Sequence, residues 1–298
     1  MKSTSLNVSV AGVRGKGMRF ARKRSFGRFW VYLFLVLVSI FCLFPFYFML
    51  AGSLMRQGEI FSLKPHFWPE NFVYQNYIDL FNSLNFTANL RNSAFVSVSQ
   101  TLGVLFFSSL AGFIFAKRRF PGRDGLFIFI LITTTLPGGY TTIIPFYLMM
   151  VQIGWINTFW PLIIPWWAPP LAIFLMRQYI SAGVPDELIE AARIDGCGLF
   201  QTYWRIVLPL CTPGLVVIGI NQFIAVWNDF LYGLLMLQKA ELRTVTVALA
   251  EISQRPSQAI PYGALFAGIV LATLPTIIIY FIFQRRLTSG ILEGSLKG

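Results

Sequence analysis

The residues with the most specific types and spacing lie in the segment 185–213, between long apolar runs. Pro185 suits the start of a helix, because the first N–H groups of a helix have no partner there and proline has none to lose. Asp186 and Glu187 follow, so negative charge lies at the positive end of the helix dipole. Gly196 is a natural end, since glycine adopts the left-handed conformation without steric cost. The segment therefore predicts a helix followed by a tight turn.

A second short helix is expected over about residues 199–207, ended by Pro209. In the first helix, Ala191 and Ala192 give a face without bulky side chains. Such a face can fit closely into a groove on another protein. The function that we expect from this helix–turn–helix is therefore docking.

The spacing of the segment is Glu-Ala-Ala, three residues, Gly, nine residues, and Ile-x-Leu-Pro. It resembles the cytoplasmic loop signature of permease subunits in ABC importers. The positions that carry the resemblance are Glu190, Ala191, Ala192, Gly196, Ile206, Leu208 and Pro209. In that family the loop is a coupling helix that docks into a cleft on a separate ATPase subunit. The resemblance implies the same role here for the loop 185–213, including its acidic residues Glu187 and Asp195. The alternative is an amphipathic helix that lies on the membrane surface.

The composition of the chain is that of a membrane protein. Of its 298 residues, 56% are hydrophobic and 12% are charged, whereas soluble domains carry about 25% charged residues. So much apolar surface needs the lipid bilayer as its solvent, which predicts an all-α integral membrane protein. The net charge of +12 is explained by basic cytoplasmic loops, so no nucleic-acid partner is expected. The three cysteines are far apart and indicate neither a disulfide framework nor a metal site.

Six apolar segments have about the ~20 residues that a transmembrane helix needs. They are at about 30–51, 92–116, 126–150, 157–176, 210–237 and 262–283. Residues 1–28 hold eight basic residues and no acid, which predicts a cytoplasmic tail that contacts anionic headgroups. Residues 29–298 then form the transmembrane domain. The first apolar run is longer than the roughly 7–15 residues of a signal peptide, so we expect it to be retained.

The distribution of basic residues predicts that both termini are cytoplasmic. With six spans and the N-terminus inside, the inner segments are the tail, 117–125, 177–209 and the C-terminus. They hold eight, four, three and three basic residues, 18 of the 24 in the chain. Inner loops of membrane proteins collect Lys and Arg, so this orientation is favoured. It also places the loop 185–213 in the cytoplasm, where an ATPase could reach it.

The third and fourth predicted spans contain helix breakers. Pro137, Gly138 and Gly139 lie within the third, and the fourth contains four prolines, Pro161, Pro165, Pro169 and Pro170. Broken backbone is tolerated inside a membrane where it lines a wet cavity or is packed in protein. These spans therefore either face a transport pathway or carry packing kinks against a neighbour.

The fifth predicted span is the most polar. It carries Asn221, Gln222, Trp227, Asn228 and Asp229. Amides and a carboxylate bond sugar hydroxyls, and an indole plane can cover a sugar ring, so a role in a substrate pathway is one interpretation. The other is that these groups hold neighbouring helices together, with Asp229 at the outer interface and paired with a backbone N–H or a lysine.

Four further features complete the resemblance. The segment 223–231 and the C-terminal segment 283–298 resemble those of maltose-type carbohydrate permeases, and six spans fit the smaller subunit of the permease pair. The outer loop 238–261 occupies the position of a loop that enters the sugar-binding protein in that family. The alternative is a short amphipathic helix on the outer leaflet.

His66 has no second ligand nearby in sequence, so a surface role is expected rather than a metal site.

These features predict the permease subunit of an ATP-driven importer of a sugar, an oligosaccharide or a sugar-like polyol, in the cytoplasmic membrane of a bacterium or archaeon. The resemblance implies a second permease subunit, two ATPase subunits that bind ATP and Mg, and an extracytoplasmic sugar-binding protein. The chain has no phosphate-binding loop of its own and no convincing catalytic set, so it is not expected to be an enzyme or to hold a cofactor. The alternative function is an ion-driven secondary transporter, but we find no internal repeat.

Overall fold

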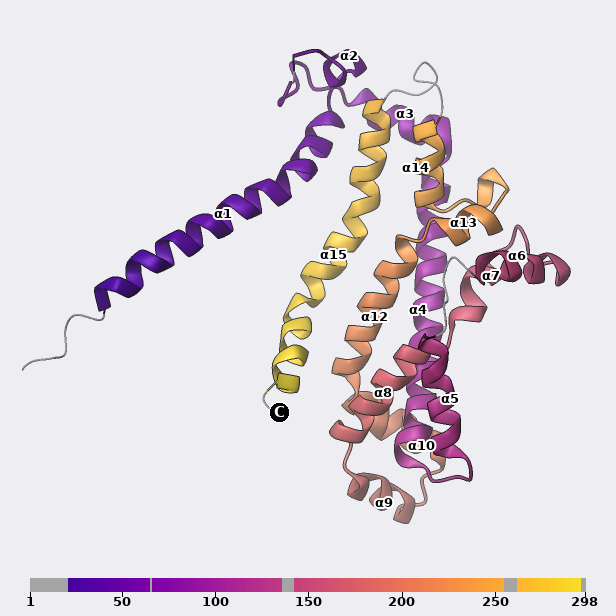
Figure 1. Cartoon of the computed structure of the whole chain (residues 1–298). Coiled ribbons are helices and arrows are strands. Elements are labelled where there is room, and N and C mark those ends of the chain that lie inside the picture. Colours follow the sequence, from indigo (N-terminus) through magenta and orange to yellow (C-terminus); the bar gives the residue numbers. More distant parts are fainter. Residues whose placement is uncertain (1–20, 65, 136–141, 255–261, 296–298) are drawn as a thin grey trace, which may run out of the picture. The chain divides into compact units, whose positions relative to one another are not determined.

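The computed structural model describes residues 21–64, 66–135, 142–254 and 262–295 (Figure 1). Every regular element in these ranges is helical, which confirms the predicted all-α class for this part of the chain. The α-helices are α1 (Ala21–Gly52), α2 (Gln57–Ile60), α3 (Gln75–Leu84), α4 (Phe86–Lys117), α5 (Arg123–Thr135), α6 (Ile143–Gln152), α7 (Trp160–Ile163), α8 (Pro170–Gly183), α9 (Asp186–Ile194), α10 (Leu199–Thr202), α11 (Leu208–Leu210), α12 (Thr212–Trp227), α13 (Leu231–Met236), α14 (Val245–Gln254) and α15 (Tyr262–Ser295). Single turns of 3₁₀-helix occupy Ile164–Trp166 and Ala240–Leu242, and a π-helical turn occupies Tyr203–Val207.

The chain divides into two units, residues 1–49 and 50–298. The first contains most of α1, which is continuous through Pro45. Its part from Arg28 to Gly52 is long and apolar enough to cross a membrane, with a mean hydropathy of 2.6. The predicted span 30–51 is therefore a helix of sufficient length. Residues 1–20 of the predicted tail lie outside the described residues, and its last residues belong to α1.

Helix α4 organises the second unit. It packs against α8 and α12, and α12 packs in turn against α15. The buried side chains of α4 recur every three or four residues, so they share one face of the helix. Many of them are polar: Asn89, Asn92, Ser93, Ser97, Gln100, Thr101, Ser108 and Ser109. Apolar side chains such as Phe95 and Leu102 are exposed instead. The helix thus turns its polar face into the protein, as expected where the surroundings are lipid.

Two glycines of α4 allow close contacts with its neighbours. A Cβ atom on Gly112 would lie 2.7 Å from Cβ of Met176 and 2.9 Å from the backbone N of Arg177, both in α8. A Cβ on Gly103 would overlap the indole ring of Trp167, which stacks on Phe107 with 5.2 Å between ring centroids. Small residues at helix interfaces let backbones approach closely, and here they fix how α8 and its preceding segment lie on α4.

The loops of the second unit gather at two ends. Figure 1 shows α9 and α10 at one end, and α2, α3 and α14 at the other, with α15 running between the two ends. At the first end, Lys117 Nζ donates to Asp186 Oδ1 over 2.6 Å. At the second, Asn89 Nδ2 donates to the carbonyl oxygen of Arg243 over 2.9 Å. Segments predicted to lie on the same side of a membrane therefore share an end.

The predicted spans are only partly reproduced as single helices. Among the described residues, three helices are long and apolar enough to cross a membrane, within α1, α4 and α15. A fourth is counted if Leu199–Leu210 and Thr212–Trp227, which meet at an angle of 80°, are taken as one span. These correspond to the first, second, sixth and fifth predicted spans. The number of crossings stays a prediction.

The fourth predicted span is broken at its prolines, as its helix breakers indicate, and the described parts of the third form two separate helices. The third, 126–150, consists of α5 and α6, and the predicted break at Pro137–Gly139 lies outside the described residues. The fourth, 157–176, is divided into α7, a 3₁₀ turn and α8. Proline lacks an N–H and clashes with the preceding turn, so four prolines in ten residues prevent one regular helix.

The outer loop 238–261 contains α14, whose apolar side chains are buried in the protein. Val245, Val247, Leu249 and Ile252 are all buried, and α14 packs against α4 and α15. A helix that used this apolar face to rest on the outer leaflet would leave it exposed in the structure. That alternative is therefore wrong for residues 245–254.

The contact at Gly112 gives a first prediction. Gly112→Ala should lower the free energy of unfolding by about 1–3 kcal/mol, because the new methyl group meets backbone that cannot move aside without separating α4 from α8. Gly125→Ala is the matched control, since a Cβ there has no atom within 4 Å. The measurement is the melting temperature of the purified protein in detergent. Equal melting temperatures for the two variants would contradict the close packing.

Candidate functional site

The predicted helix–turn–helix is present and its first helix is α9. Pro185 precedes the helix rather than opening it, and Asp186 and Glu187 lie in the first turn as predicted. Gly196 has φ of +80°, so the turn uses the left-handed conformation expected of a glycine there. The amide N–H of Cys197 donates to the carbonyl of Ala192 over 2.9 Å, which closes the end of the helix.

The two alanines of the signature point in different directions. Ala191 is exposed, whereas Ala192 has only 4% of its surface exposed. Ala192 lies on the same face as the buried Ile189, three residues earlier. The expectation of one smooth face formed by both alanines is therefore wrong: α9 turns Ala192 inward and presents Ala191 outward together with Glu187 and Glu190.

The second helix extends further than predicted. It begins at Leu199, widens into the π-helical turn Tyr203–Val207 and ends at Leu210, so Pro209 lies within it. The π turn ends two residues before Pro209, whose missing N–H disturbs the α-helical pattern in the preceding turn. The turn places Tyr203 in the core, where its hydroxyl is 2.8 Å from Oγ of Ser109 in α4. This hydrogen bond ties the helix–turn–helix to the centre of the protein.

The remaining signature residues are divided between core and surface. Leu208 packs against the buried cluster around Tyr203. Ile206 is half-buried, while Glu190, Asp195, Gly196 and Pro209 are exposed. The signature therefore holds the helix–turn–helix in place on one side and leaves an exposed surface on the other.

That exposed surface is more apolar than the sequence suggested. Ile194 has 86% of its surface exposed, and Leu188 is also exposed. On the second helix, Phe200 stacks on Trp204 with 6.2 Å between ring centroids, and both side chains are exposed. Large apolar side chains exposed on neighbouring helices are typical of a surface that binds another protein. We call Leu188, Ala191, Ile194, Phe200 and Trp204 the knob surface.

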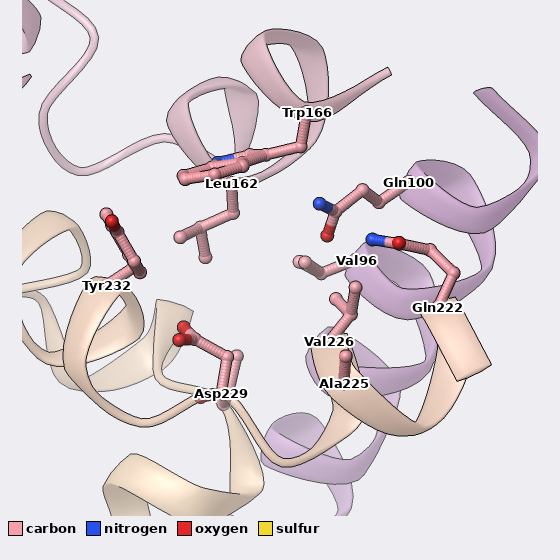
Figure 2. Close-up of a pocket in the computed structure, with 10 residues that line it drawn as sticks. Val96, Gln100, Leu162, Trp166, Gln222, Ala225, Val226, Asp229 and Tyr232 are labelled. Atoms are coloured by element: carbon pink, nitrogen blue, oxygen red, sulfur yellow. The ribbon is translucent and has the colours of Figure 1, made fainter. Parts of the chain in front are cut away.

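A second candidate site is a pocket of about 180 Å³ among α4, α12, α13 and the segment 162–166 (Figure 2). It is lined by Val96, Gln100, Leu162, Trp166, Gln222, Ala225, Val226, Asp229, Tyr232 and Thr244. Figure 2 shows the side-chain amides of Gln100 and Gln222 close together, with Asp229 and Tyr232 across the pocket from them. The lining thus combines hydrogen-bonding groups with aromatic faces.

Asp229 lies in the short connection between α12 and α13. Its Oδ2 accepts a hydrogen bond of 3.1 Å from the backbone N–H of Gly233 in the first turn of α13. Its carbonyl oxygen accepts one of 2.7 Å from the hydroxyl of Thr246. A side chain on Gly233 would meet Thr244 and Val247 at 3.1 Å, so α13 and α14 lie close together here. The predicted pairing of Asp229 with a backbone N–H is confirmed, and Asp229 also lines the pocket.

Of the five residues predicted on the fifth span, the structure brings only Gln222 and Asp229 into the pocket. Trp227 is buried, stacks on Phe223, and donates its indole N–H to the carbonyl of Ala272 in α15 over 2.9 Å. Asn221 and Asn228 are exposed, and each bonds the carbonyl four residues earlier in its own helix. Trp227 therefore joins two helices, while the two asparagines point away from the pocket.

The aromatic wall of the pocket was not foreseen. Trp166 donates its indole N–H to the carbonyl of Pro161 over 3.3 Å, and its ring packs edge-on against Tyr232 with 5.0 Å between centroids. Phe146 contacts both rings. The sequence signal for this wall is weak, because the three aromatics come from three separate segments.

A polar clasp holds the outer segment against α4. Asn92 Nδ2 donates to the carbonyl oxygens of Glu241 and Arg243, over 2.8 and 3.2 Å. The hydroxyl of Ser93 accepts the backbone N–H of Val245 over 2.8 Å. These bonds position Thr244, which lines the pocket.

Among the described residues, no group of three or more His, Cys, Asp or Glu could hold a metal ion. Nε2 of His66 lies 3.1 Å from Oε1 of Glu70.

Comparison with known proteins places the chain in a family. Residues 108–293 match the family model described as "Binding-protein-dependent transport system inner membrane component". This match covers more than half of the chain. The chain belongs to this family. The resemblance to importer permeases, expected from the loop 185–213, is thereby confirmed.

Several curated relatives in this family are similar over nearly their whole length. The arabinooligosaccharides transport system permease protein AraQ of Bacillus subtilis is 33% identical over 274 residues, which cover 89% of this chain and 94% of the relative. The trehalose/maltose transport system permease protein MalG of Thermococcus litoralis is 32% identical, with 88% and 94% covered. A crystal structure of a bacterial ABC transporter involved in the import of the acidic polysaccharide alginate contains a similar fold. That chain has a TM-score of 0.80 at 23% identity, with 91% of this chain and 99% of that chain covered.

The different directions of the two alanines give a second prediction. In a background with Cys42→Ser and Cys197→Ser, which removes the two thiols that are not buried, Ala191→Cys should react with a maleimide several times faster than Ala192→Cys. The reason is that a thiol must reach solvent to react. The measurement is the rate of labelling followed by mass spectrometry. Equal rates would mean that α9 is rotated or loosely held.

Proposed function

We propose that this permease subunit carries a sugar, an oligosaccharide or a sugar-like polyol into the cytoplasm as part of an ATP-driven importer. The support for the sugar class is the printed names of the relatives, which include permeases for arabinooligosaccharides, trehalose/maltose and lactose. Its family is one of transport permeases rather than enzymes. The chemistry of ATP hydrolysis belongs to separate ATPase subunits that bind ATP and Mg.

The observation that carries the proposal is the knob surface on the helix–turn–helix. A surface with Ile194 almost fully exposed is costly in water and finds its natural partner in an apolar groove. The exposed carboxylates of Glu187, Glu190 and Asp195 lie in α9 or directly after it and favour a groove with a basic rim. We assign this surface, with the signature residues that support it, to docking on an ATPase subunit.

Motion of the ATPase would reach the pocket through two rigid connections. The first is the hydrogen bond between Tyr203 and Ser109, which joins the second helix of the loop to α4. The second is the 80° bend at Cys211, where the helix Leu199–Leu210 meets α12. A push on the knob would tilt α12, and α12 carries Gln222 and ends beside Asp229. The pathway would then alternate between inward-open and outward-open states.

The assembly that we propose has a second permease subunit, two ATPase subunits and an extracytoplasmic sugar-binding protein. The chain would cross the cytoplasmic membrane of a bacterium or archaeon six times, with both termini inside. The segregation of loops supports this orientation: the basic segment 117–125 shares an end with α9, and α3 shares the other end with α14. Inner loops are the ones that collect basic residues.

A charge reversal on the knob tests coupling. Glu190→Lys should abolish ATP-dependent uptake while the amount of protein in the membrane stays normal, because the exposed carboxylate faces the docking groove. Glu70→Lys is the matched control, an equally drastic change of an exposed glutamate in the segment between α2 and α3, where its side chain contacts only His66 among the described ion pairs, and should retain uptake. Uptake by the whole transporter is measured with labelled substrate. Undiminished uptake with Glu190→Lys would show that the coupling role is wrong.

Crosslinking locates the partner directly. In the background without Cys42 and Cys197, Ala191→Cys should crosslink to a cysteine introduced in the groove of the ATPase, with a yield that changes when nucleotide is added. Ala240→Cys, which is exposed on the outer segment, should give no such product. If Ala191→Cys finds no ATPase in membranes that still take up substrate, and uptake depends on an ion gradient, the chain is a secondary transporter instead.

A further inference from the structure

The pocket in Figure 2 is lined, among the described residues, by an acidic side chain and by no basic one. Asp229 lines it, and none of the described lining residues is Lys, Arg or His. Arg243 belongs to the outer segment nearby, but its guanidinium forms an ion pair with Glu251 in α14, and it lines a separate pocket between α13 and α14. The pocket, whose described lining is mostly apolar, therefore presents one carboxylate to its contents without a basic side chain in that lining.

The structural role of Asp229 does not explain this charge. Its Oδ2 accepts the N–H of Gly233, which an asparagine oxygen would accept as well, since Asn and Asp serve almost equally at helix starts. A charged side chain within a membrane segment is costly, and such residues mark functional positions. The hydrogen bond to Gly233 explains why the side chain at position 229 has an oxygen. It does not explain why that side chain is a carboxylate, so we look for a second role.

The other lining groups suit an uncharged sugar. The amides of Gln100 and Gln222 each offer a donor and an acceptor, which matches the hydroxyl groups of carbohydrate. The ring of Trp166 is held by its bond to Pro161 and by the edge of Tyr232, so it forms a fixed aromatic wall. A sugar that carries a carboxylate would bring a second negative charge beside Asp229, with no cation in the lining to pair with it.

We propose that this pocket admits neutral carbohydrate and that Asp229 is a specificity-determining residue that rejects acidic sugars. The proposal rests on the function proposed above and narrows its substrate class. Selection works here through an unfavourable interaction with the wrong substrate, a common means of specificity. The alginate importer shares the fold but imports an acidic polysaccharide. The shared fold therefore does not determine whether the cargo is acidic or neutral.

The first test measures the electric field in the pocket without a sugar. The whole transporter carries Cys42→Ser, Cys197→Ser and Cys211→Ala, with Ala225→Cys as the reporter, since Ala225 lines the pocket. Its rate of reaction is measured with a cationic and with an anionic methanethiosulfonate of similar size. Gln152→Cys provides the reference ratio, because Gln152 is exposed and lies in the uncharged segment 151–156.

The preference for the cationic reagent should be about tenfold greater at position 225 than at position 152, because Asp229 acts over a short distance in a poorly solvated site. Adding Asp229→Asn, which keeps an oxygen for Gly233, should bring the ratio at position 225 down to the reference. Equal ratios at the two positions, or a ratio that Asp229→Asn leaves unchanged, would overturn the charge filter.

The second test measures transport. ATP-dependent uptake is compared for neutral oligosaccharides prepared from starch and arabinan and for uronate oligosaccharides prepared from alginate and pectin. We expect uptake within the neutral group alone. Uptake of the uronates at comparable rates would overturn the inference and leave the proposed function intact. If a wider panel of sugars, oligosaccharides and polyols also gives no ATP-dependent uptake, the proposed function fails, while the thiol rates still decide whether Asp229 filters charge.

Discussion

The burial of one polar face of α4 is the constraint on which the rest of the second unit depends. Asn89, Asn92, Ser93 and Ser109 would lose their hydrogen-bond partners if this face turned to lipid, and the other polar side chains of the face would find none there. They must face other helices, and the glycines of α4 let those neighbouring segments come close. Gly112 admits α8 and Gly103 admits the ring of Trp167. The arrangement of α8 and of the segment before it follows from these contacts.

The same helix connects three places where function is proposed. Ser109 bonds Tyr203 under the knob surface, Gln100 lines the pocket, and Asn92 holds the outer segment. Each connection comes from a polar side chain of α4, on its buried face. A helix with hydrogen bonds at both ends and a pocket between them is a continuous physical link between the proposed docking surface and the proposed substrate pathway, as coupling between two such sites would need.

The sequence predicted local features well and lateral contacts poorly. The helix–turn–helix and the left-handed Gly196 could be predicted, because charge at a helix start and glycine at its end act within a few residues. The direction of Ala192 could not, because it depends on which face of α9 packs toward the buried cluster that contains Ile189 and Tyr203, and only packing decides that. The chemistry of Trp227 allowed either a pathway role or a role in joining helices, and the structure gives the second, because its indole N–H donates to the carbonyl of Ala272, 45 residues away. Gln100 and Trp166 were missed because the pocket draws its walls from segments distant in sequence.

The size of the pocket indicates how a single subunit can contribute to a sugar pathway. Complete sites for small molecules occupy about 300–1,000 Å³, and the pocket holds about 180 Å³. It therefore suits one sugar ring or part of a longer chain. In transporters built from two related halves, the substrate lies at the interface between them near the middle of the membrane. A second permease subunit would supply the missing wall, so the residues of this chain would act on only part of the cargo. A single charged residue such as Asp229 can still exclude a substrate even if this chain contacts only part of it, because rejection needs one unfavourable contact while recognition needs many favourable ones.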